Sequence, residues 1–365
     1  MFEAAIALRY HFFSFASMKK ILYITRANLC LRRAHSHNIM TTARVLARCN
    51  EISVALVSSG KQSCTVTETF LRHGIYEDCA ITKTRSLVFF LFRKGREFDI
   101  VYFRDPRLVG VIFLARLLGK KIIFEIHGSR EWKGLWWLWR LAFRLSHIRL
   151  FITRALQADY PRASKNIFCI PTVALNLSDY DIQPAGHKGF RALSLVGEQN
   201  RYYDVMMLVR MLSYCSEDVS LELVGLKDED TRIIRDEVMR LGVEKQLEIT
   251  GRVDPAEIPK YLKNADVLLN PKVRGHAGSI SSKLYEYMAA RRPVVASVIP
   301  ADREILNEKN ACIVEPRPES FANAVMQLKE DKELRESLAT QARRDAEHYT
   351  FEKKKELFED FLKKI

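Results

Sequence analysis

The chain has 365 residues, 48% of them hydrophobic and 28% charged, which fits a globular protein with room for two domains. Lys and Arg exceed Asp and Glu by 14, and residues 1–189 hold 29 basic against 13 acidic residues. A one-sided basic surface favours an anionic partner such as lipid head groups, nucleic acid or an acidic glycan. No uncharged apolar run approaches the length of a spanning helix, so we expect a protein that does not cross a membrane.

The seven cysteines are odd in number and never form a CxxC pair. This spacing argues against both a disulfide framework and a zinc site, and it fits a reducing cytosol. No acidic cluster suggests a metal site either. We therefore expect a cytoplasmic protein without a structural metal.

Residues 1–17 precede MKKILYITRA, which reads as a natural start, so we interpret 1–17 as a mobile extension. From Met18 onward, short apolar segments alternate with helical ones, which predicts a parallel sheet covered on both faces. The strands are expected at 21–25, 52–57, 100–103, 121–126, 150–152 and 167–170.

The segment 178–190 has no periodicity and contains Pro184, Gly186 and Gly189, so it reads as a linker. A second alternation follows, and the tail is charged and helical with a break near Thr350. The sequence thus predicts an α/β protein with two similar domains, at 18–185 and 190–350, and a final helix at 351–365 that packs back on the first domain. The strands of the second domain are expected at 191–196, 220–224, 247–250, 265–270 and 293–296.

One stretch of the second domain, residues 270–297, is suited to a phosphate group. A strand runs into a loop of small residues, and that loop opens a short helix at 283–290. Small residues let backbone N–H groups turn toward a ligand, and the N–H groups of a helix N-terminus attract anions. On this helix Glu286 points away from the core face, so its carboxylate is placed to accept hydrogen bonds from ribose hydroxyls. The small residues of the loop are Gly275, Gly278, Ser279, Ser281 and Ser282.

The sequence KLYEYMAARRPVVAS resembles the signature helix and strand in the C-terminal half of glycosyltransferase family 4 enzymes. The resemblance extends from about Lys19 to the end and implies the GT-B fold, in which two Rossmann-like domains face a cleft. It implies that Glu286 holds the nucleotide ribose and that the loop from Gly278 to Ser282 holds the diphosphate. Many members have a second glutamate, which reads the donor sugar, where this chain has Gly278.

The resemblance also assigns roles outside this helix. His127 and Gly128 end a strand, and the matching histidine lies close to the donor sugar, so His127 is the catalytic candidate; a satisfied structural histidine is the alternative. Gly197 and Arg201 match a loop that reaches the diphosphate, and Arg252 and Val253 match a turn on the nucleobase. Arg201 as a surface residue, and residues 251–253 as an ordinary turn, are the alternatives. Lys283 is either a cation for the phosphate or a solvated side chain.

All four tryptophans lie in residues 132–149, together with several basic residues. Indole rings prefer the membrane interface and cations attract anionic head groups, so we expect a helix that lies on an anionic membrane. A second apolar and basic stretch, 86–96, is expected beside it. The alternative is a core helix with a solvated basic face. The predicted membrane contacts are Trp132, Trp136, Trp137, Trp139, Arg140 and Arg144.

Together these patterns predict a retaining glycosyltransferase that moves a sugar from a nucleotide diphosphate sugar to a lipid-linked or glycan acceptor. Cell-surface polysaccharide or glycolipid synthesis, at the inner face of the membrane and without a cofactor or metal, is the expected setting. Arg104 and Gly128 are acceptor-side candidates, although Arg104 also reads as half of a structural pair with Asp105. A nucleotide-sugar epimerase of the same fold is the alternative; a nucleic-acid-binding protein has only the charge in its favour, since no RNA or DNA module is recognisable.

Overall fold

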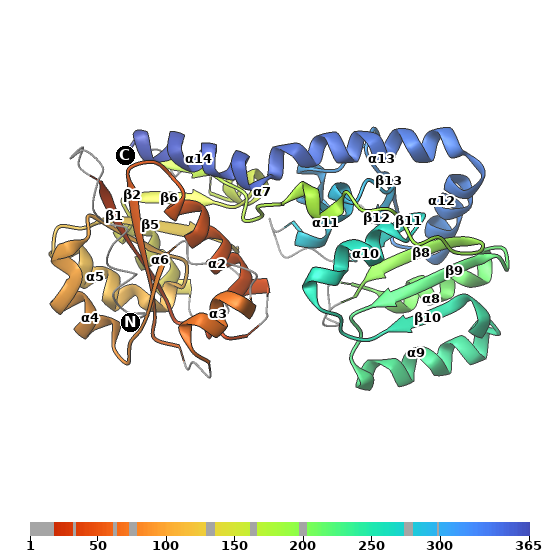
Figure 1. The fold of residues 1–365 in the computed structure, drawn as a ribbon, viewed down its shortest axis with the longest axis horizontal. Helices are drawn as coiled ribbons and strands as arrows, with labels where there is room; N and C mark the ends of the chain where they lie inside the picture. Colours follow the sequence, from red (N-terminus) through yellow and green to blue (C-terminus); the bar gives the residue numbers. More distant parts are fainter. Residues whose placement is uncertain are drawn as a thin grey trace. The chain divides into compact units, whose positions relative to one another are not determined.

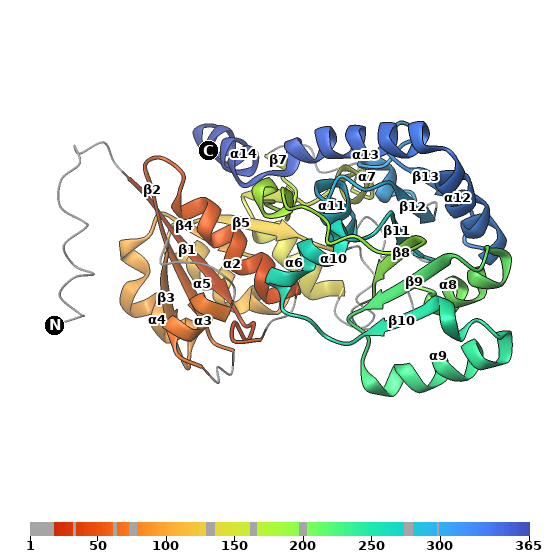
Figure 2. The ribbon, with the colours of Figure 1, turned by 45° about the vertical axis from the view of Figure 1, so that its right-hand side comes forward.

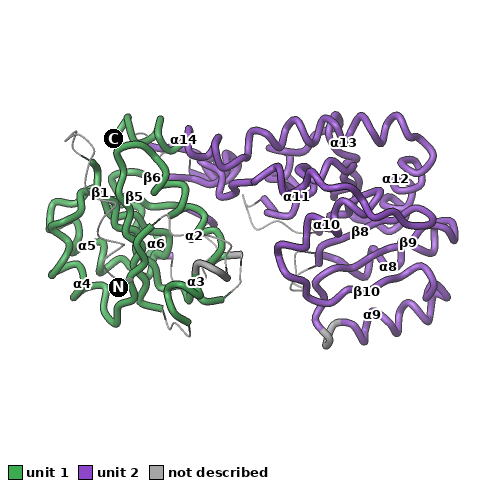
Figure 3. The backbone as a smooth tube through the Cα atoms, viewed as in Figure 1, with its two compact units in different colours: residues 1–125, 137–149, 358–365 green, residues 126–136, 150–357 purple. Residues whose placement is uncertain are grey.

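The computed structural model describes residues 18–31, 34–60, 64–72, 79–128, 136–160, 166–196, 203–273, 280–297 and 299–365 (Figure 1). The predicted extension 1–17 lies outside the described residues. The chain divides into two compact units (Figure 3). Unit 1 holds residues 1–125, 137–149 and 358–365, and unit 2 holds residues 126–136 and 150–357.

The first half of the chain forms a seven-stranded sheet in the order β3-β2-β1-β4-β5-β6-β7. The pairings of β1 with β2 and β4, of β2 with β3 and of β4 with β5 are parallel. Most residues of the central strands are buried, as expected for a parallel sheet covered on both faces. The strands are β1 (Lys19–Thr25), β2 (Ile52–Ser58), β3 (Ala80–Lys83), β4 (Ile100–Phe103), β5 (Lys121–Ile126), β6 (Ile148–Phe151) and β7 (Ile167–Cys169).

Helices connect these strands, and the strand order fixes which face each helix covers. Crossovers between parallel strands are right-handed, so connections that run in opposite directions along the sheet lie on opposite faces. The helices α2 and α3 follow strands that step one way, whereas α4, α5 and α6 follow strands that step the other way. The helices are α2 (Ala34–Ala47), α3 (Val66–Arg72), α4 (Leu87–Lys94), α5 (Val109–Leu117), α6 (Trp136–Leu145) and α7 (Arg154–Ala158).

Unit 2 contains a six-stranded parallel sheet in the order β10-β9-β8-β11-β12-β13. Its central strands are mostly apolar because both faces are covered, although β8 contains Arg191 and β9 contains Glu222. On β11, Val267 and Leu269 enter one apolar cluster while Leu268 enters the other, on the opposite face. The strands are β8 (Phe190–Leu195), β9 (Val219–Val224), β10 (Leu247–Thr250), β11 (Val267–Asn270), β12 (Val294–Ser297) and β13 (Cys312–Val314).

The helices of unit 2 pack on both faces of this sheet, and α11 lies against α13 (Figure 2). The last helix, α14 (Phe351–Lys363), ends within unit 1, where the Lys19 ammonium donates to the Leu362 carbonyl at 2.8 Å and the Asn50 N–H donates to the Glu359 carboxylate at 3.0 Å. The other helices are α8 (Val205–Met211), α9 (Asp228–Leu241), α10 (Ile258–Lys263), α11 (Ser282–Ala289), α12 (Pro318–Glu330) and α13 (Lys332–Ala346).

One disulfide corrects the expectation drawn from the cysteine spacing. Cys30, after β1, is bonded to Cys64, after β2, with a Cα–Cα distance of 5.7 Å. The strands β1 and β2 are neighbours, so the loops that leave them meet at one edge of the sheet although 34 residues separate the two cysteines. The other five cysteines are free thiols.

Candidate functional site

The candidate site of unit 2 lies where its strand order reverses. The chain steps from β8 outward to β9 and β10, and then returns to the other side of β8 to form β11. In open parallel sheets, ligands bind beyond the carboxyl ends of the strands at this reversal. The candidate site therefore consists of the residues that follow β8 and β11 and of the helix α11, which comes after β11.

The start of α11 is held by two side chains from other segments. The backbone N–H of Ser281, which precedes the helix, donates to the Asp302 carboxylate, and its hydroxyl is hydrogen-bonded with Tyr203. The Ser281 side chain does not cap its own helix. Its position is thus set by its neighbours, while the first N–H groups of α11, which begins at Ser282, keep the electropositive character of a helix N-terminus.

Glu286 leaves α11 on a different side from the core residues, as the helical spacing predicts. Leu284 and Met288 are fully buried, whereas Glu286 is half-buried. Burial raises the pKa of Glu286 to about 7, and the neighbouring Lys283 opposes that rise. Tyr180 lies close enough for the Glu286 charge to raise the pKa of its hydroxyl, after burial as the main cause. The carboxylate is therefore short of solvation and suited to accept hydrogen bonds from a ligand.

Lys283 does not lie in solvent. Its ammonium donates to the carbonyl oxygens of Leu195 at 2.6 Å and Val196 at 2.9 Å, at the carboxyl end of β8. It also lies 4.5 Å from the ring centroid of Tyr203. Burial lowers the pKa of Lys283 to about 8, and the Glu286 charge works against that change. Lys283 thus brings a positive charge to the strand reversal.

A buried ion pair, which the sequence did not reveal, lies beside this cation. The Lys272 ammonium is 3.0 Å from the Asp302 carboxylate, and their side chains are 4% and 3% exposed. Lys272 follows β11 and Asp302 follows β12. Burial raises the pKa of Asp302, while Lys272 and the Ser281 N–H oppose the rise. The only sequence signal was a polar residue shortly after the end of each of two adjacent strands.

Tyr203 joins these elements. It forms an antiparallel bridge with Lys272, and the N–H of the next residue, Asp204, donates to the Pro271 carbonyl at 2.9 Å. Burial raises the pKa of the Tyr203 hydroxyl, with the hydrogen bond to Ser281 opposing it. The described part of the site therefore draws on the ends of β8, β11 and β12 and on the start of α11.

Several other predicted site residues are not among the contacts described above for the start of α11. Val253 packs against the apolar cluster that contains Leu284, and Arg252 beside it is exposed. His127 and Gly128 directly follow β5 and are half-buried, and a Cβ atom added at Gly128 would meet no atom within 4 Å. The predicted residues that lie outside the described part of the chain are Gly197, Arg201, Gly275, Gly278, Ser279 and Trp132.

Asp105, the expected partner of Arg104, forms an ion pair with Arg107. Asp105 accepts two hydrogen bonds from the Arg107 Nε, at 2.9 and 3.1 Å, and one from its Nη2 at 2.8 Å. Arg104 instead interacts with Tyr23, because its charge and a hydrogen bond lower the pKa of that buried hydroxyl against the larger effect of burial. The guanidinium of Arg107 thus binds both oxygens of the Asp105 carboxylate.

Trp139 is also not a membrane contact. It is 7% exposed, and its ring centroid lies 5.9 Å from that of Phe124 and 5.0 Å from that of Phe143. It is therefore a core residue of α6. The other predicted contacts within the described part of α6, namely Trp136, Trp137, Arg140 and Arg144, are exposed.

The described residues contain neither a cluster of metal ligands nor a membrane-spanning helix. Among the described residues, no three His, Cys, Asp or Glu side chains gather as metal ligands. No described helix is both long enough and apolar enough to cross a bilayer.

Residues 192–331 match the family model described as glycosyl transferases group 1. A phosphatidyl-myo-inositol mannosyltransferase of Mycobacterium leprae is 33% identical over 124 residues, which are 33% of this chain and 32% of that protein. The uncharacterized glycosyltransferase MJ1607 of Methanocaldococcus jannaschii is 29% identical over 166 residues, 44% of this chain and 42% of that protein. The chain thus spans about a third to two fifths of the curated relatives it matches.

Solved structures match over nearly the whole chain. The structure of Anabaena Alr3699/HepE in complex with UDP gives a TM-score of 0.81 at 16% identity, over 95% of this chain and 100% of that one. The structure of TarM gives a TM-score of 0.77 at 11% identity, over 95% and 99%. At such identity the likeness shows a shared fold.

Proposed function

We propose that the protein is a glycosyltransferase that uses a nucleotide diphosphate sugar, because residues 192–331 match the group 1 glycosyl transferase model and the chain shares the GT-B fold of the similar structures. The observation that carries the proposal is the placement of Glu286 and Lys283 on one turn of α11, at the strand reversal of unit 2. An acid that accepts from ribose hydroxyls and a cation beside a helix N-terminus are the groups that such a donor needs.

The donor would be held by complementary charges. Glu286, whose burial leaves it short of hydrogen-bond donors, would accept from the two ribose hydroxyls. An ammonium has three N–H donors, and Lys283 uses two of them on the carbonyl groups of Leu195 and Val196, so its third would be available to a phosphate oxygen. Ser282 and the loop with Gly278 and Ser279 would contribute N–H groups, and Ser281, whose own N–H donates to Asp302, would hold the start of α11 in place. Gly197 and Arg201 would approach the same phosphates.

Departure of the nucleoside diphosphate adds negative charge to the phosphate oxygens. A helix N-terminus and a fixed ammonium stabilise that charge as it develops, without reorganising during the reaction. The Lys272–Asp302 pair would act indirectly, since Asp302 fixes the Ser281 N–H at the start of α11. His127 would lie toward the donor sugar, and Arg252 and Val253 toward the base.

We propose a lipid-linked or glycan acceptor, retention of the anomeric configuration, and a role in cell-surface polysaccharide or glycolipid synthesis. The named activity of the mannosyltransferase relative, which concerns phosphatidyl-myo-inositol, supports a lipid-linked acceptor. The neighbour structures determined with UDP and UDP-glucose support a nucleotide sugar donor. The proposed reaction uses no cofactor or metal. We place the protein at the inner face of the cell membrane, and we assign Arg104 and Gly128 to the acceptor side of the site.

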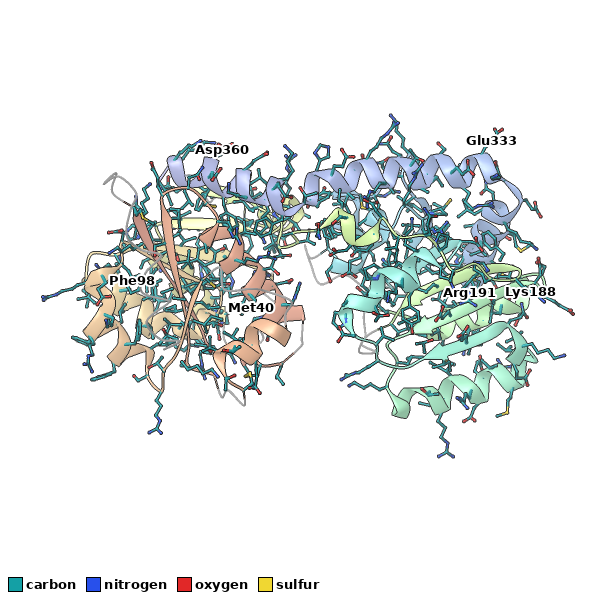
Figure 4. All side chains as sticks on the ribbon, in the orientation of Figure 1. Met40, Phe98, Lys188, Arg191, Glu333 and Asp360 are labelled. Carbon is teal, nitrogen blue, oxygen red and sulfur yellow. A yellow bond between two sulfur atoms is a disulfide. The ribbon has the colours of Figure 1, made fainter. Side chains whose placement is uncertain are left out.

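A donor screen tests the proposal. Each of a panel of nucleotide diphosphate sugars is added to the protein and its melting temperature is measured, because a ligand that binds only the folded state stabilises it by about 2.7 kcal/mol at 100 times its Kd. Glu286→Ala should abolish the shift. Glu333→Ala, an exposed acid on α13 whose side chain points away from the body of unit 2, should preserve it (Figure 4).

The products then identify the reaction. A glycosyltransferase releases the nucleoside diphosphate only when an acceptor is present, whereas an epimerase converts the nucleotide sugar without one. If no nucleotide sugar raises the melting temperature of the wild type, or if Glu286→Ala keeps the full shift, the donor site is not where we place it.

A further inference from the structure

Three neighbouring helices of the first half of the chain expose apolar side chains to solvent. On α4, Phe89 and Phe92 are 65% and 66% exposed, and on α5 Phe113 and Leu117 are 54% and 69% exposed. Eight of the fourteen large hydrophobic residues that are exposed within the described part of the chain belong to α4, α5 and α6. We call these eight the apolar patch; they are Val88, Phe89, Phe92, Phe113, Leu117, Trp136, Trp137 and Leu141.

The three helices lie side by side. The strand order places α4, α5 and α6 on the same face of the seven-stranded sheet. α4 and α5 are in contact, as Figures 1 and 2 also show. The Arg116 guanidinium of α5 donates to the Leu145 carbonyl at the end of α6, at 2.6 Å. The exposed apolar residues are therefore parts of one surface.

Basic residues surround the apolar patch and acidic residues are scarce. Residues 84–149 contain 14 Lys and Arg against five Asp and Glu. Two of these cations form ion pairs with nearby acids: Lys94 lies 3.1 Å from Glu97, and Arg107 lies 2.8 Å from Asp105. The Lys94 and Glu97 side chains both remain more than half exposed. The exposed cations on and beside these helices are Arg85, Arg93, Lys94, Arg96, Arg116, Arg140 and Arg144.

We propose that this face rests on an anionic lipid bilayer, with the apolar patch among the acyl chains nearest the head groups and the cations on the head groups. Aromatic residues together with Lys and Arg are what the membrane interface favours, and the attraction adds to the apolar transfer. The core of a protein–protein interface is instead depleted of charged residues. The two tryptophans at the start of α6 belong to the patch, while Trp139 faces inward.

The proposal concerns a surface of the first half of the chain and is independent of the donor site of unit 2. It also makes Phe89 and Phe92 more important than the tryptophans that dominate the sequence pattern. Both phenylalanines are almost two thirds exposed, so replacing them removes little buried contact and the variant should fold.

Vesicle binding tests the proposal. The protein is sedimented with vesicles of phosphatidylcholine alone and with vesicles containing 30 mol% phosphatidylglycerol, each in 0.1 M and 0.5 M NaCl. The two lipids separate anionic from neutral head groups. The higher salt shortens the Debye length from about 10 Å to a few ångströms and so weakens electrostatic attraction. We expect binding to the anionic vesicles that weakens at high salt, and a blue shift of tryptophan emission as Trp136 and Trp137 leave water. Arg93→Ala and Arg96→Ala should each weaken partitioning about fivefold.

Phe89→Ser/Phe92→Ser should lower partitioning at least tenfold while leaving the melting temperature unchanged. The matched control is Ile233→Ser/Met239→Ser on α9, where the side chains are 64% and 60% exposed, and it should bind vesicles like the wild type. Wild-type protein that stays in the supernatant with anionic vesicles, or a phenylalanine variant that binds them undiminished, would overturn the proposal. So would a loss of self-association in that variant without a loss of vesicle binding, since the patch would then contact a second copy.

Discussion

Glu286→Gln should stabilise unit 2 at alkaline pH and weaken nucleotide binding at the same time. In the folded protein, burial raises the pKa of Glu286 from 4.5 to about 7. The stability that goes with the protonated carboxyl is therefore complete below pH 4.5 and is lost as the pH rises through 7. Glutamine is neutral throughout and does not incur this loss.

The size of the effect follows from the shift. A change from 4.5 to about 7 at 1.36 kcal/mol per unit gives an upper value of about 3.4 kcal/mol at pH 8. Two factors reduce it: Glu286 is half-buried rather than sealed from water, and its removal withdraws the charge that supports protonated Lys283. We expect a net gain of about 1–2 kcal/mol at pH 8 and a gain near zero at pH 4.

The assay has to report on unit 2 alone. The described tryptophans, Trp136, Trp137 and Trp139, all lie on α6, so their fluorescence does not follow the sheet of unit 2. Hydrogen exchange of the amides in α11 and β12 gives the opening free energy of the site itself. Equal protection of the wild type and Glu286→Gln at pH 8, or a gain that persists unchanged at pH 4, would contradict the reasoning.

The same variant should bind the nucleotide sugar about tenfold or more weakly. A hydrogen bond to an ionised group contributes about 1.5–3 kcal/mol, against about 1 kcal/mol for a neutral one, and glutamine offers one carbonyl oxygen in place of two carboxylate oxygens. Calorimetric titration with the donor found in the screen measures this. Higher stability of the ligand-free protein together with lower affinity for the nucleotide sugar would not result from a simple loss of packing.

Three further predictions concern groups that the sequence did not reveal. Lys272→Met should destabilise unit 2 by about 3–5 kcal/mol because it leaves Asp302 buried without its cation, whereas Lys272→Met/Asp302→Leu should recover most of that loss; urea unfolding followed by circular dichroism compares them, and equal losses would mean that the pair is not coupled. Thiol titration of the denatured protein should find five reactive cysteines before reduction and seven after it. Cys30→Ser/Cys64→Ser, which opens a loop of 34 residues, should cost unit 1 about 4 kcal/mol, measured by tryptophan fluorescence during urea unfolding; an unchanged midpoint would show that the bond contributes nothing.

Central strands could be predicted from the sequence because burial on both faces makes most of their residues apolar. The strands that were not predicted, β3 and β13, are both at sheet edges. β3 reads AITK and its ends are exposed, and β13 is three residues long and only half-buried. A strand with one neighbour needs less apolar surface, so its sequence carries a weaker signal, although the edge strands β7 and β10 were still predicted.

Within the candidate site, too, features set by residues close in sequence could be predicted, whereas contacts between residues far apart in sequence could not. Glu286 could be predicted because the spacing of Leu284 and Met288 fixes the core face of one helix. Lys272 and Asp302 could not, since their pairing depends on two strands that lie side by side but whose following residues are 30 positions apart. The Cys30–Cys64 disulfide was not predicted for the same reason, since 34 residues separate the two cysteines. Trp139 differs: its inward direction follows from helical periodicity, but the crowding of aromatic residues around it obscured the pattern.

The two described charge pairs of the proposed donor site differ in a way that bears on its function. Lys272 and Asp302 are sealed from water and face each other, so their positions are fixed before any ligand arrives. Lys283 and Glu286 lie on one helical turn, but the lysine donates to the carbonyl groups of Leu195 and Val196, and burial still outweighs the acid's support for its charge. Their pKa values, about 8 and about 7, leave both groups close to a change of protonation near neutral pH. A phosphate favours the charged lysine, and ribose hydroxyls favour the charged acid, so one ligand would move both pKa values toward the ordinary range. Binding at the proposed site would thereby recover the free energy that burial of these two charges costs, so we expect the affinity to depend on Lys283 and Glu286.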